Sequence, residues 1–430
     1  MDRISYLNAS RVEPVQLNAD GTARGVLAGR KVLIIVENLP VPFDRRVWQE
    51  ACTLREAGAL VSVICPEGKA YTKRYEFLDG IHIYRHSLPV EAKGALGFLL
   101  EYSAALIHEM RLAVRIYFKH GFDVIHGCNP PDLIFLVALP FKLLGKRYIF
   151  DHHDISPELY ESKFGKRGLA WSALKLAEWL TFKIADVVIS TNDSYRKIAI
   201  ARGGRQPEDV FVVRSGPDLV RVKAHTPNPS WRRGRRFLVG YVGVMGTQEG
   251  IDLLLEAAVH MVHKLGRRDV QFCLVGGGPS LRDLKALAEK MGLDDCVTFT
   301  GRASDETLFE ILSTADVCVN PDRVNAMNDK STMNKILEYM ALGKPIVQFD
   351  VAEGRFSAGE ASLYAKPNDP IDFAEKLLSL LEDPQARARR GAIGRARVEE
   401  RFAWTYEAPK LLQAYSRALA EPGRQPRGGR

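Results

Sequence analysis

The 430-residue chain has few cysteines, no long hydrophobic run and only a small excess of charge. Its six cysteines show no Cys-x-x-Cys spacing, which argues against a disulfide framework or a zinc site. The longest apolar run, residues 133–141, is far shorter than the roughly 18–20 residues that a membrane span requires. Residues 1–28 hold no apolar stretch of the kind found in signal peptides. We therefore expect reduced thiols, no membrane span and a cytoplasmic location.

The composition is that of an ordinary globular protein, with 46% apolar and 26% charged residues. At roughly 100–200 residues per domain, the chain has room for two or three domains. The net charge of +8 is concentrated in residues 196–236, which hold eleven Lys and Arg against three acids. Because Pro and Gly punctuate this stretch, it is typical of a solvated linker and not of a nucleic-acid-binding face. The alternative is that this basic stretch binds an anionic substrate or a lipid surface.

Short apolar runs, of which the first at 31–36 is β-branched, alternate with helical periodicity, and this pattern occurs twice along the chain. The first series predicts strands at 31–36, 60–65, 81–84, 123–126, 147–151 and 186–190. The second predicts strands at 237–243, 270–275, 297–299, 316–319 and 345–349. Buried strands that alternate with helices indicate βαβ units. We predict an α/β chain of two Rossmann-like, doubly wound domains that face each other across a cleft.

The predicted boundaries follow from this double pattern and from the basic stretch. We expect a mobile tail at 1–28, a first domain at 29–204, a basic linker at 205–235 and a second domain at 236–400. Residues 401–420 form a last helix with no strand to follow, so we expect it to pack back on the first domain. A Pro/Gly/Arg tail at 421–430 ends the chain.

Three consecutive glycines mark a strand-to-helix turn in the second domain. Gly276, Gly277 and Gly278 close one predicted strand and open a helix at 280–291. Glycines at such a turn let backbone N–H groups approach a phosphate at the helix N-terminus. A tight turn that does no more than start the helix is the alternative. The spacing is not Gly-x-Gly-x-x-Gly, so NAD binding is not indicated.

A second candidate site lies on the helix that ends at Gly343. Asn334, Lys335 and Glu338 fall within one turn of it. The start of a helix favours an anion, and Lys335 adds positive charge for a diphosphate. Glu338 can accept two hydrogen bonds from a ribose diol. An amphipathic helix with a surface Lys–Glu pair is the alternative.

From 31 to about 419 the chain resembles the nucleotide-sugar-dependent glycosyltransferases of family 4, also called group 1, which have the GT-B fold and retain anomeric configuration. The resemblance is carried by residues 237–257, the glycine turn, Phe299-Thr-Gly301 and above all the sequence Asn334-Lys-Ile-Leu-Glu-Tyr-Met-Ala-Leu-Gly-Lys-Pro345. It implies that the second domain binds the donor, through Gly276, Gly277, Gly278, Lys335 and Glu338. The first domain then binds the acceptor.

The same resemblance assigns residues of the first domain. Asp123-Val-Ile-His-Gly-Cys-Asn-Pro-Pro131 is similar to the segment where the family places a catalytic histidine, which implies that role for His126. A structural histidine at a strand end is the alternative. His153 and Asp154 follow the next strand and are acceptor-side candidates. Arg45 and Arg46 are candidates for contact with the acceptor or the phosphates.

Three positions depart from the family pattern. Val244 and Glu249 stand where the family usually has an Arg and a Lys that grip the diphosphate, and Lys330 replaces the first glutamate of its Glu-x7-Glu pair. Lys330, Lys335, Arg45 and Arg46 offer positive charge from other directions. Either the donor binds in a different pose or activity is lost.

The predicted function is transfer of a sugar from a nucleotide diphosphate sugar to a glycan or lipid-linked saccharide, in bacterial exopolysaccharide or lipopolysaccharide assembly. A GT-B-type epimerase and a degenerate scaffold of a polysaccharide-assembly complex are the alternatives. No Asp-x-Asp lies in a suitable loop, so we expect neither metal nor other cofactor. An apolar helical stretch around 96–118, with Lys93, Arg111, Arg115 and Lys119 near it, favours peripheral contact with the inner face of an anionic membrane. A core-packed helix is the alternative, and no nucleic-acid partner is expected.

Overall fold

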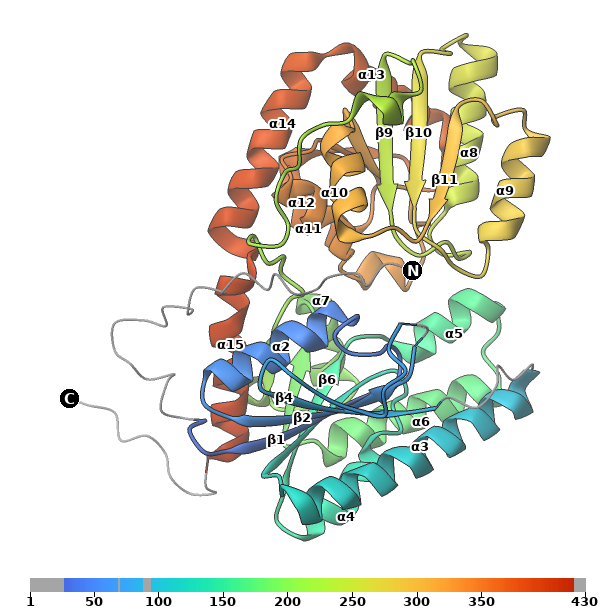
Figure 1. Cartoon of the computed structure of the whole chain (residues 1–430). Coiled ribbons are helices and arrows are strands. Elements are labelled where there is room, and N and C mark those ends of the chain that lie inside the picture. Colours follow the sequence, from blue (N-terminus) through green and yellow to red (C-terminus); the bar gives the residue numbers. More distant parts are fainter. Residues whose placement is uncertain (1–26, 69, 88–93, 421–430) are drawn as a thin grey trace. The chain divides into compact units, whose positions relative to one another are not determined.

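The computed structural model describes residues 27–68, 70–87 and 94–420 (Figure 1). The chain divides into two compact units. Unit 1 holds the residues up to Ser215 except Ser162–Phe164, together with those from Glu407 onward. Unit 2 holds Gly216–Tyr406 and Ser162–Phe164. The expected tail at 421–430 and most of that at 1–28 lie outside the described residues.

Unit 1 is built on one eight-stranded sheet in which all neighbours but one pair are parallel. The exception is an antiparallel pair at one edge. In order across the sheet the strands are β3 (Tyr75–Leu78), β4 (Ile81–His86), β2 (Leu60–Pro66), β1 (Lys31–Val36), β5 (Val124–Cys128), β6 (Arg147–His152), β7 (Val187–Ser190) and β8 (Val210–Val212).

The helices of unit 1 cover the two faces of that sheet. They are α2 (Arg45–Glu56), α3 (Gly94–Lys119), α4 (Phe135–Leu143), α5 (Ser156–Phe164), α6 (Leu169–Ile184), α7 (Asp193–Ala201) and α15 (Trp404–Leu419). Buried side chains of α3, α4, α6 and α7 form one core with the sheet. Side chains of α2 and α15 reach the other face, where Glu50 and Tyr415 both contact His126 of β5.

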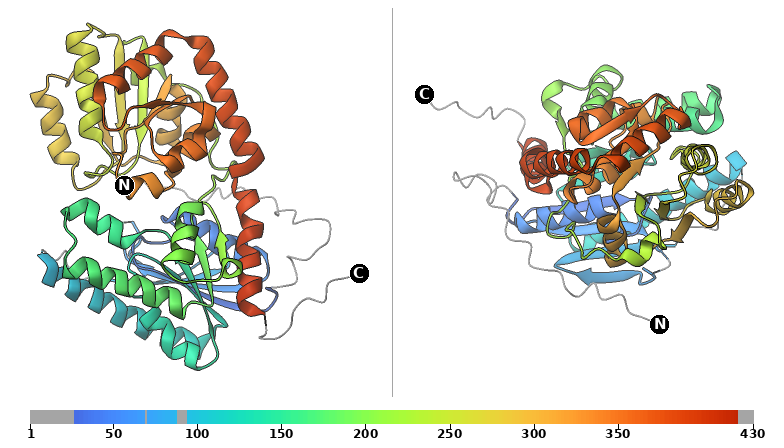
Figure 2. Two further views of the ribbon diagram at one scale, coloured as in Figure 1. Left: turned by 180° about the vertical axis from the view of Figure 1, so that it is seen from behind. Right: turned by 90° about the horizontal axis from the view of Figure 1, so that it is seen from above.

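Unit 2 is a six-stranded parallel sheet. In order across it the strands are β11 (Val297–Gly301), β10 (Val270–Val275), β9 (Phe237–Val242), β12 (Val317–Asn320), β13 (Ile346–Phe349) and β14 (Ser362–Ala365). One core packs α8 (Ile251–Val259), α9 (Leu281–Lys290) and α13 (Pro370–Glu382) on one face, and a second packs α10 (Asp305–Thr314) and α11 (Asn334–Ala341) on the other. Two further helices contact α11, namely α12 (Ala352–Ala358) and α14 (Pro384–Arg397). Figure 2 shows unit 2 from behind, with α14 in orange-red.

The predicted architecture of two parallel-sheet α/β domains is confirmed. Both sheets have the strand order of doubly wound folds, with chain neighbours running outward in both directions from the first strand. The structure places part of the expected linker at 205–235 inside unit 1, because β8 pairs with β7 there. Unit 2 accordingly begins at Gly216 and extends to Tyr406. None of the described helices is both long enough and apolar enough to cross a membrane.

Candidate functional site

The order of strands in unit 2 reverses between β9 and β12, and ligands of open α/β sheets bind outside the carboxyl ends of strands at such a point. Gly243 follows β9, Asp322 follows β12, and the three glycines follow β10. The helix α11 brings Lys335 to the same end, where its ammonium lies 5.5 Å from the centre of the Tyr241 ring. The sequence-predicted donor residues therefore gather at this edge of the sheet.

Packing explains two of the three glycines. A Cβ on Gly276 would lie 1.8 Å from the carbonyl oxygen of Gly243, and the backbone there has φ +139°. A Cβ on Gly278 would lie 2.5 Å from the carbonyl oxygen of Met245. Gly277 differs, because its nearest neighbour would be the Arg302 side chain at 3.5 Å. Gly276 and Gly278 are thus required by the contact between two loops, and Gly277 is the glycine with room beside it.

Lys335 is held by buried polar groups. Its ammonium donates to both carboxylate oxygens of Asp322, at 2.7 and 2.8 Å, and to Asn320 Oδ1 at 3.0 Å. Burial raises the pKa of Asp322, and Lys335 opposes that shift. The cation that the sequence assigns to a diphosphate is therefore already balanced by one acid.

Glu338, one turn further along α11, faces a cation. Arg221 NH2 lies 3.2 Å from Glu338 Oε1, and Arg221 NH1 donates to Asp305 Oδ2 at 2.8 Å. The Glu338 side chain is 13% exposed, so it is largely buried, and Arg221 holds its carboxylate. Lys330 lies in the short 3₁₀ turn Asn328–Lys330 before α11 and is half-buried.

Val244 and Glu249, the two departures from the family pattern in the turn after β9, each have their own structural consequence. Val244 is 57% exposed, and its carbonyl accepts a hydrogen bond from the Tyr241 hydroxyl at 2.8 Å. Glu249 accepts from the Gly246 N–H at 3.0 Å, which fixes the loop. Burial raises the pKa of Glu249, while nearby Lys335 lowers it. The turn thus presents an apolar side chain and an acid.

Unit 1 has its own reversal of strand order, between β1 and β5. The helix α2 begins beside it, with Asp44 as N-cap accepting from the Val47 N–H at 3.1 Å. The two arginines of its first turn lie in different environments: Arg45 is exposed, whereas the Arg46 side chain is only 7% exposed. Of the pair predicted for the phosphates or acceptor, Arg45 points to solvent and Arg46 is part of the interior.

Arg46 organises a buried charge cluster. Its guanidinium donates to both oxygens of Asp151, at 2.9 and 3.2 Å, and lies 3.1 Å from Glu50 Oε1. Burial alone would raise the pKa of Asp151, but Arg46 and His153 outweigh it and hold that pKa well below its usual value. Burial raises the pKa of Glu50 well above its usual value, against the pull of Arg46. The cluster therefore contains one carboxylate whose ionised form Arg46 stabilises, that of Asp151, and a second, that of Glu50, whose ionisation is opposed by burial.

His126 lies at the centre of this cluster and has no exposed surface. Its Nδ1 is 2.7 Å from the Tyr415 hydroxyl, and its Nε2 is 3.3 Å from Asp151 Oδ2 and 3.6 Å from Glu50 Oε2. Burial lowers the pKa of His126, with Asp151 opposing, so the ring is neutral. Both ring nitrogens face protein groups, which conflicts with the expected contact between His126 and the substrate.

His153 and Asp154 lie nearer the surface, in the loop after β6. His153 Nε2 is 2.5 Å from Asp151 Oδ2 and 2.9 Å from Arg46 Nε, and its side chain is 15% exposed. Asn129 Oδ1 accepts from the backbone N–H groups of both residues, at 2.6 and 3.1 Å. The loop after β5 thereby fixes the loop after β6.

One group of potential metal ligands stands out among the described residues. Donor atoms of Glu50, Cys128, Asp151 and His153 all lie within 4.8 Å of one another. A metal there would compete with Arg46 for both carboxylates. Burial also raises the pKa of the Cys128 thiol well above its usual value, which disfavours the thiolate that binds metals.

The basic stretch at 196–236 differs from a solvated linker, because acids within the same unit compensate many of its arginines. The pairs are Arg202–Glu158, Arg214–Asp193, Arg221–Asp305, Arg232–Asp316 and Arg235–Asp295.

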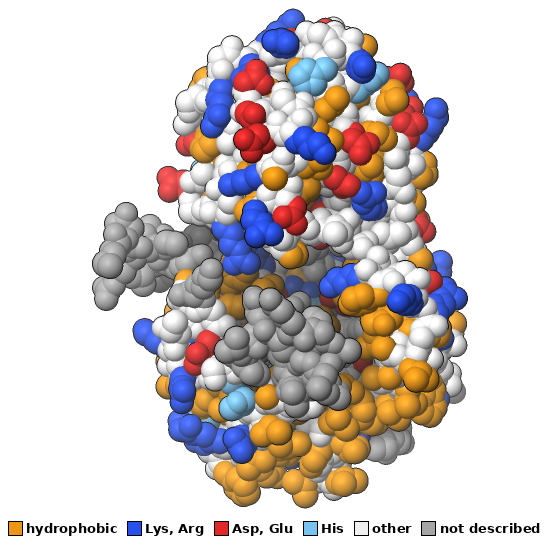
Figure 3. Space-filling model, turned by 90° about the vertical axis from the view of Figure 1, so that its right-hand side faces the viewer, with side chains coloured by type: hydrophobic (Ala, Val, Ile, Leu, Met, Phe, Trp, Pro, Cys, Tyr) orange, Lys and Arg blue, Asp and Glu red, His pale blue; other side chains and the backbone are white. Residues whose placement is uncertain are grey.

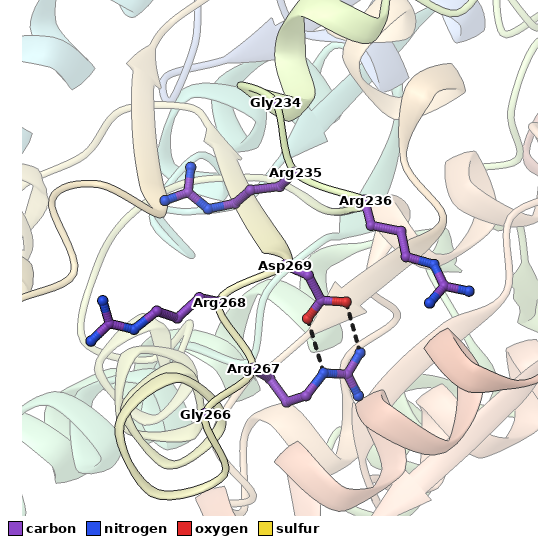
Figure 4. Close-up of a pocket in the computed structure, with 7 residues that line it drawn as sticks. All are labelled: Gly234, Arg235, Arg236, Gly266, Arg267, Arg268 and Asp269. Atoms are coloured by element: carbon purple, nitrogen blue, oxygen red, sulfur yellow. Dashed lines mark hydrogen bonds and ion pairs between the residues drawn. The ribbon is translucent and has the colours of Figure 1, made fainter.

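A hollow of about 570 Å³ lined by Arg235, Arg236, Arg267 and Arg268 lies at the other end of the unit 2 sheet, where β9 and β10 begin (Figure 4). Arg267 is paired there with Asp269. Because the hollow lies where these strands begin, it is separate from the donor-side edge, where the strands end.

Sequence reasoning missed the partners of the predicted residues. Asp322, Arg221, Glu50 and Tyr415 each contact a residue that was singled out. Two of them had a signal in the sequence: Glu50 lies four residues after Arg46 on one helix, and Asp322 follows a predicted strand of the second domain.

Two family models match the chain. Residues 44–221 match the model described as Glycosyltransferase Family 4, and residues 236–383 match the model described as Glycosyl transferases group 1. The two matches fall on the two units and together take in about three quarters of the chain.

Curated relatives include sugar transferases of several bacteria. Alpha-D-kanosaminyltransferase of Streptomyces kanamyceticus is 31% identical over 156 residues, covering 36% of this chain and 39% of that protein. MMP alpha-(1->4)-mannosyltransferase of Mycolicibacterium hassiacum is 25% identical over 322 residues, covering 70% and 72%. The matches to several D-inositol 3-phosphate glycosyltransferases span about half of those proteins.

Solved structures share the fold across nearly the whole chain. Sucrose-phosphate synthase from Thermosynechococcus elongatus is 21% identical with a TM-score of 0.74, covering 90% of this chain and 98% of that one. HepE of Anabaena in complex with UDP-glucose is 18% identical with a TM-score of 0.70, covering 90% and 99%.

Proposed function

The chain belongs to the family 4, or group 1, glycosyltransferases of GT-B fold, and on that premise we propose that it transfers a sugar from a nucleotide diphosphate sugar to a glycan or lipid-linked saccharide with retention of configuration. One observation carries the proposal. Lys335, Glu338 and the glycine turn gather at the carboxyl-end edge of the unit 2 sheet, where its strand order reverses. Two α/β domains, one for each substrate, suit a two-substrate reaction.

The donor is assigned to unit 2. Glu338 accepts hydrogen bonds from the ribose hydroxyls, and Arg221 keeps its carboxylate in place for them. Gly277 approaches the diphosphate, because no neighbouring backbone fills the space beside it. Lys335 and Lys330 supply positive charge, and the diphosphate takes over part of the contact that Lys335 now makes with Asp322.

The acceptor is assigned to unit 1. Arg45, His153 and Asp154 are the members of the predicted set that reach the surface, and Asp154 follows His153 in the chain. We assign His126 a positioning role in place of contact with substrate, because it is buried and faces Asp151, which in turn holds His153. Its removal acts on turnover through the loop that carries His153.

In the proposed reaction, the bond between the sugar C1 and the leaving phosphate oxygen breaks, and the acceptor oxygen bonds to C1 on the same face. The acceptor proton passes to that phosphate oxygen. Charge develops on the leaving diphosphate, so preorganised cations near it supply the largest catalytic contribution. These steps use groups of the chain and of the two substrates.

We place the protein in the cytoplasm, at the inner face of the membrane, in exopolysaccharide or lipopolysaccharide assembly. All six cysteines are free and five are buried, as fits a reducing compartment. At that face the protein would meet a lipid-linked saccharide acceptor.

A donor screen tests the proposal. Purified chain is mixed with UDP- and GDP-sugars and a lipid-diphosphate saccharide, and the product's anomeric configuration is read by NMR. We expect one donor to support transfer with retention. Release of nucleotide with an altered sugar and no acceptor would favour an epimerase. Failure to bind any nucleotide sugar would favour a scaffold, the alternative to which Val244 and Glu249 point.

A further inference from the structure

Unit 1 carries an exposed apolar face formed by three helices. We define it by Ile107, Val114 and Phe118 of α3, Leu136, Leu139 and Leu143 of α4, and Leu169, Leu176 and Trp179 of α6, all at least 38% exposed. Phe118 and Leu143 are 83% exposed and Leu169 is 92% exposed. The helix α4 contacts both α3 and α6, so the nine side chains belong to neighbouring helices. Figure 3 shows hydrophobic side chains gathered over the lower part of the molecule.

The outer side of α4 exposes no charged residue. From α4 to its C-cap Leu144, the exposed residues are Leu136, Leu139, Pro140, Leu143 and Leu144. A solvated helix keeps charged and polar residues on its outer side. An apolar patch of this kind marks a surface that another apolar phase covers.

Basic residues border the apolar face on α3. Arg111, Arg115 and Lys119 follow one another at intervals of four residues and line a hollow of about 320 Å³, together with Arg74 and Arg85. Within the described part of the chain, Arg111 and Arg115 have no acidic partner. Ile107, Val114 and Phe118 form an apolar stripe on the same helix as this basic stripe. One surface of α3 can therefore contact both an apolar phase and an anion.

Cations also lie over the aromatic rings of these helices. Lys175 and Arg167 stand over Trp171, at 5.1 and 5.4 Å, and Lys183 stands over Trp179 at 5.8 Å. Lys146 stands over Tyr117 at 5.6 Å. Side chains with an apolar body and a charged or polar tip suit the boundary between acyl chains and headgroups.

We propose that the apolar face of α3, α4 and α6 inserts into the surface of an anionic membrane, with Arg111, Arg115 and Lys119 binding lipid phosphates. The helices lie in the interface and do not cross it, in keeping with the absence of a spanning helix among the described residues. This inference rests on the proposed function for its biological setting, because a lipid-linked acceptor would be presented at that surface. The charge complementarity favours a membrane over a second copy of this chain, because the basic stripes of two copies would repel each other.

Vesicle sedimentation of the full chain tests the inference. The probes are vesicles of phosphatidylcholine alone and of equal parts phosphatidylcholine and phosphatidylglycerol. We expect binding to the anionic vesicles that weakens as salt is raised. The triple variant F118E/L143E/L169E should lower the partition coefficient about tenfold or more, because it places charge where acyl chains would lie. The control is Ile371→Glu on α13 of unit 2, an apolar residue that is 51% exposed outside this face, and this variant should bind as the parent does.

The charge variant R111E/R115E should lose most of the binding to anionic vesicles together with its salt dependence. Wild-type affinity in the triple variant, or no vesicle binding by the parent chain, would overturn the inference. A parent dimer that the triple variant converts to monomer, without vesicle binding, would assign the face to a second copy. Calorimetry of UDP binding on the same proteins keeps the two proposals apart, since donor binding without vesicle binding leaves the proposed function standing.

Discussion

The hydroxyl of Tyr415 lies 2.7 Å from Nδ1 of His126, although the two residues are 289 positions apart in the sequence. Tyr415 belongs to the last helix and His126 to a central strand of unit 1, so the end of the chain completes the interior of its first domain. Asp151 Oδ2 lies 3.3 Å from the other ring nitrogen, which favours the tautomer with the proton on Nε2 and with Nδ1 accepting from the tyrosine. The tyrosine then supplies the buried Nδ1 with a hydrogen-bond donor.

Tyr415→Phe should therefore destabilise the protein. The substitution leaves Nδ1 of His126 buried without its donor, which costs about 1–3 kcal/mol of unfolding free energy. The measurement is denaturant unfolding. Tyr406→Phe is the matched control, because its hydroxyl donates to the Glu399 carbonyl but the residue is 43% exposed. Equal stability of the two variants would show that the contact with His126 adds nothing.

His152 should make stability depend on pH. Burial lowers the pKa of His152 to about 3, whereas an unfolded histidine has a pKa of about 6.5. The folded state binds fewer protons in this range, so the contribution is complete above about pH 6.5 and is lost as pH falls toward 3.

His152→Phe tests that dependence, since Phe150, Phe182 and Tyr195 surround the ring. Between about pH 6 and pH 4, the slope of unfolding free energy against pH should fall by about 1.4 kcal/mol per pH unit, which corresponds to one proton. The exposed His263→Phe should keep the parent slope. An unchanged slope in His152→Phe would assign the acid sensitivity to other groups.

The glycine turn allows packing and ligand binding to be separated. Gly276→Ala should cost about 2 kcal/mol or more, because its Cβ meets the Gly243 carbonyl and its backbone has positive φ. Gly277→Ala should change unfolding free energy by less than about 1 kcal/mol. It should nevertheless weaken UDP binding, since the methyl group enters the space assigned to the diphosphate. Parent affinity in Gly277→Ala would remove that residue from the donor site.

The sheets could largely be predicted from the sequence because buried parallel strands are nearly continuous apolar runs, as at 31–36 and 237–242. The strands that prediction missed are short or exposed. β3 is a half-exposed edge strand, β8 is three residues within the basic stretch, and β14 is four residues at the edge of the other sheet. Lys335 and Glu338 were predicted because they share one helical turn. Their partners Asp322 and Arg221 were not, since those contacts come from tertiary packing. The burial of His126 depends on α2 and α15, which no local pattern connects to β5.

The central claim is that unit 2 binds a nucleotide sugar through Glu338, and calorimetry of UDP binding tests it most directly. Glu338→Ala should weaken affinity about tenfold or more, because a charged acceptor for the ribose hydroxyls is worth roughly 1.5–3 kcal/mol. Glu375→Ala, at an exposed position of α13, should bind UDP as the parent does. The account predicts loss of affinity in the first variant alone, with both proteins folded. Parent affinity in Glu338→Ala would contradict it.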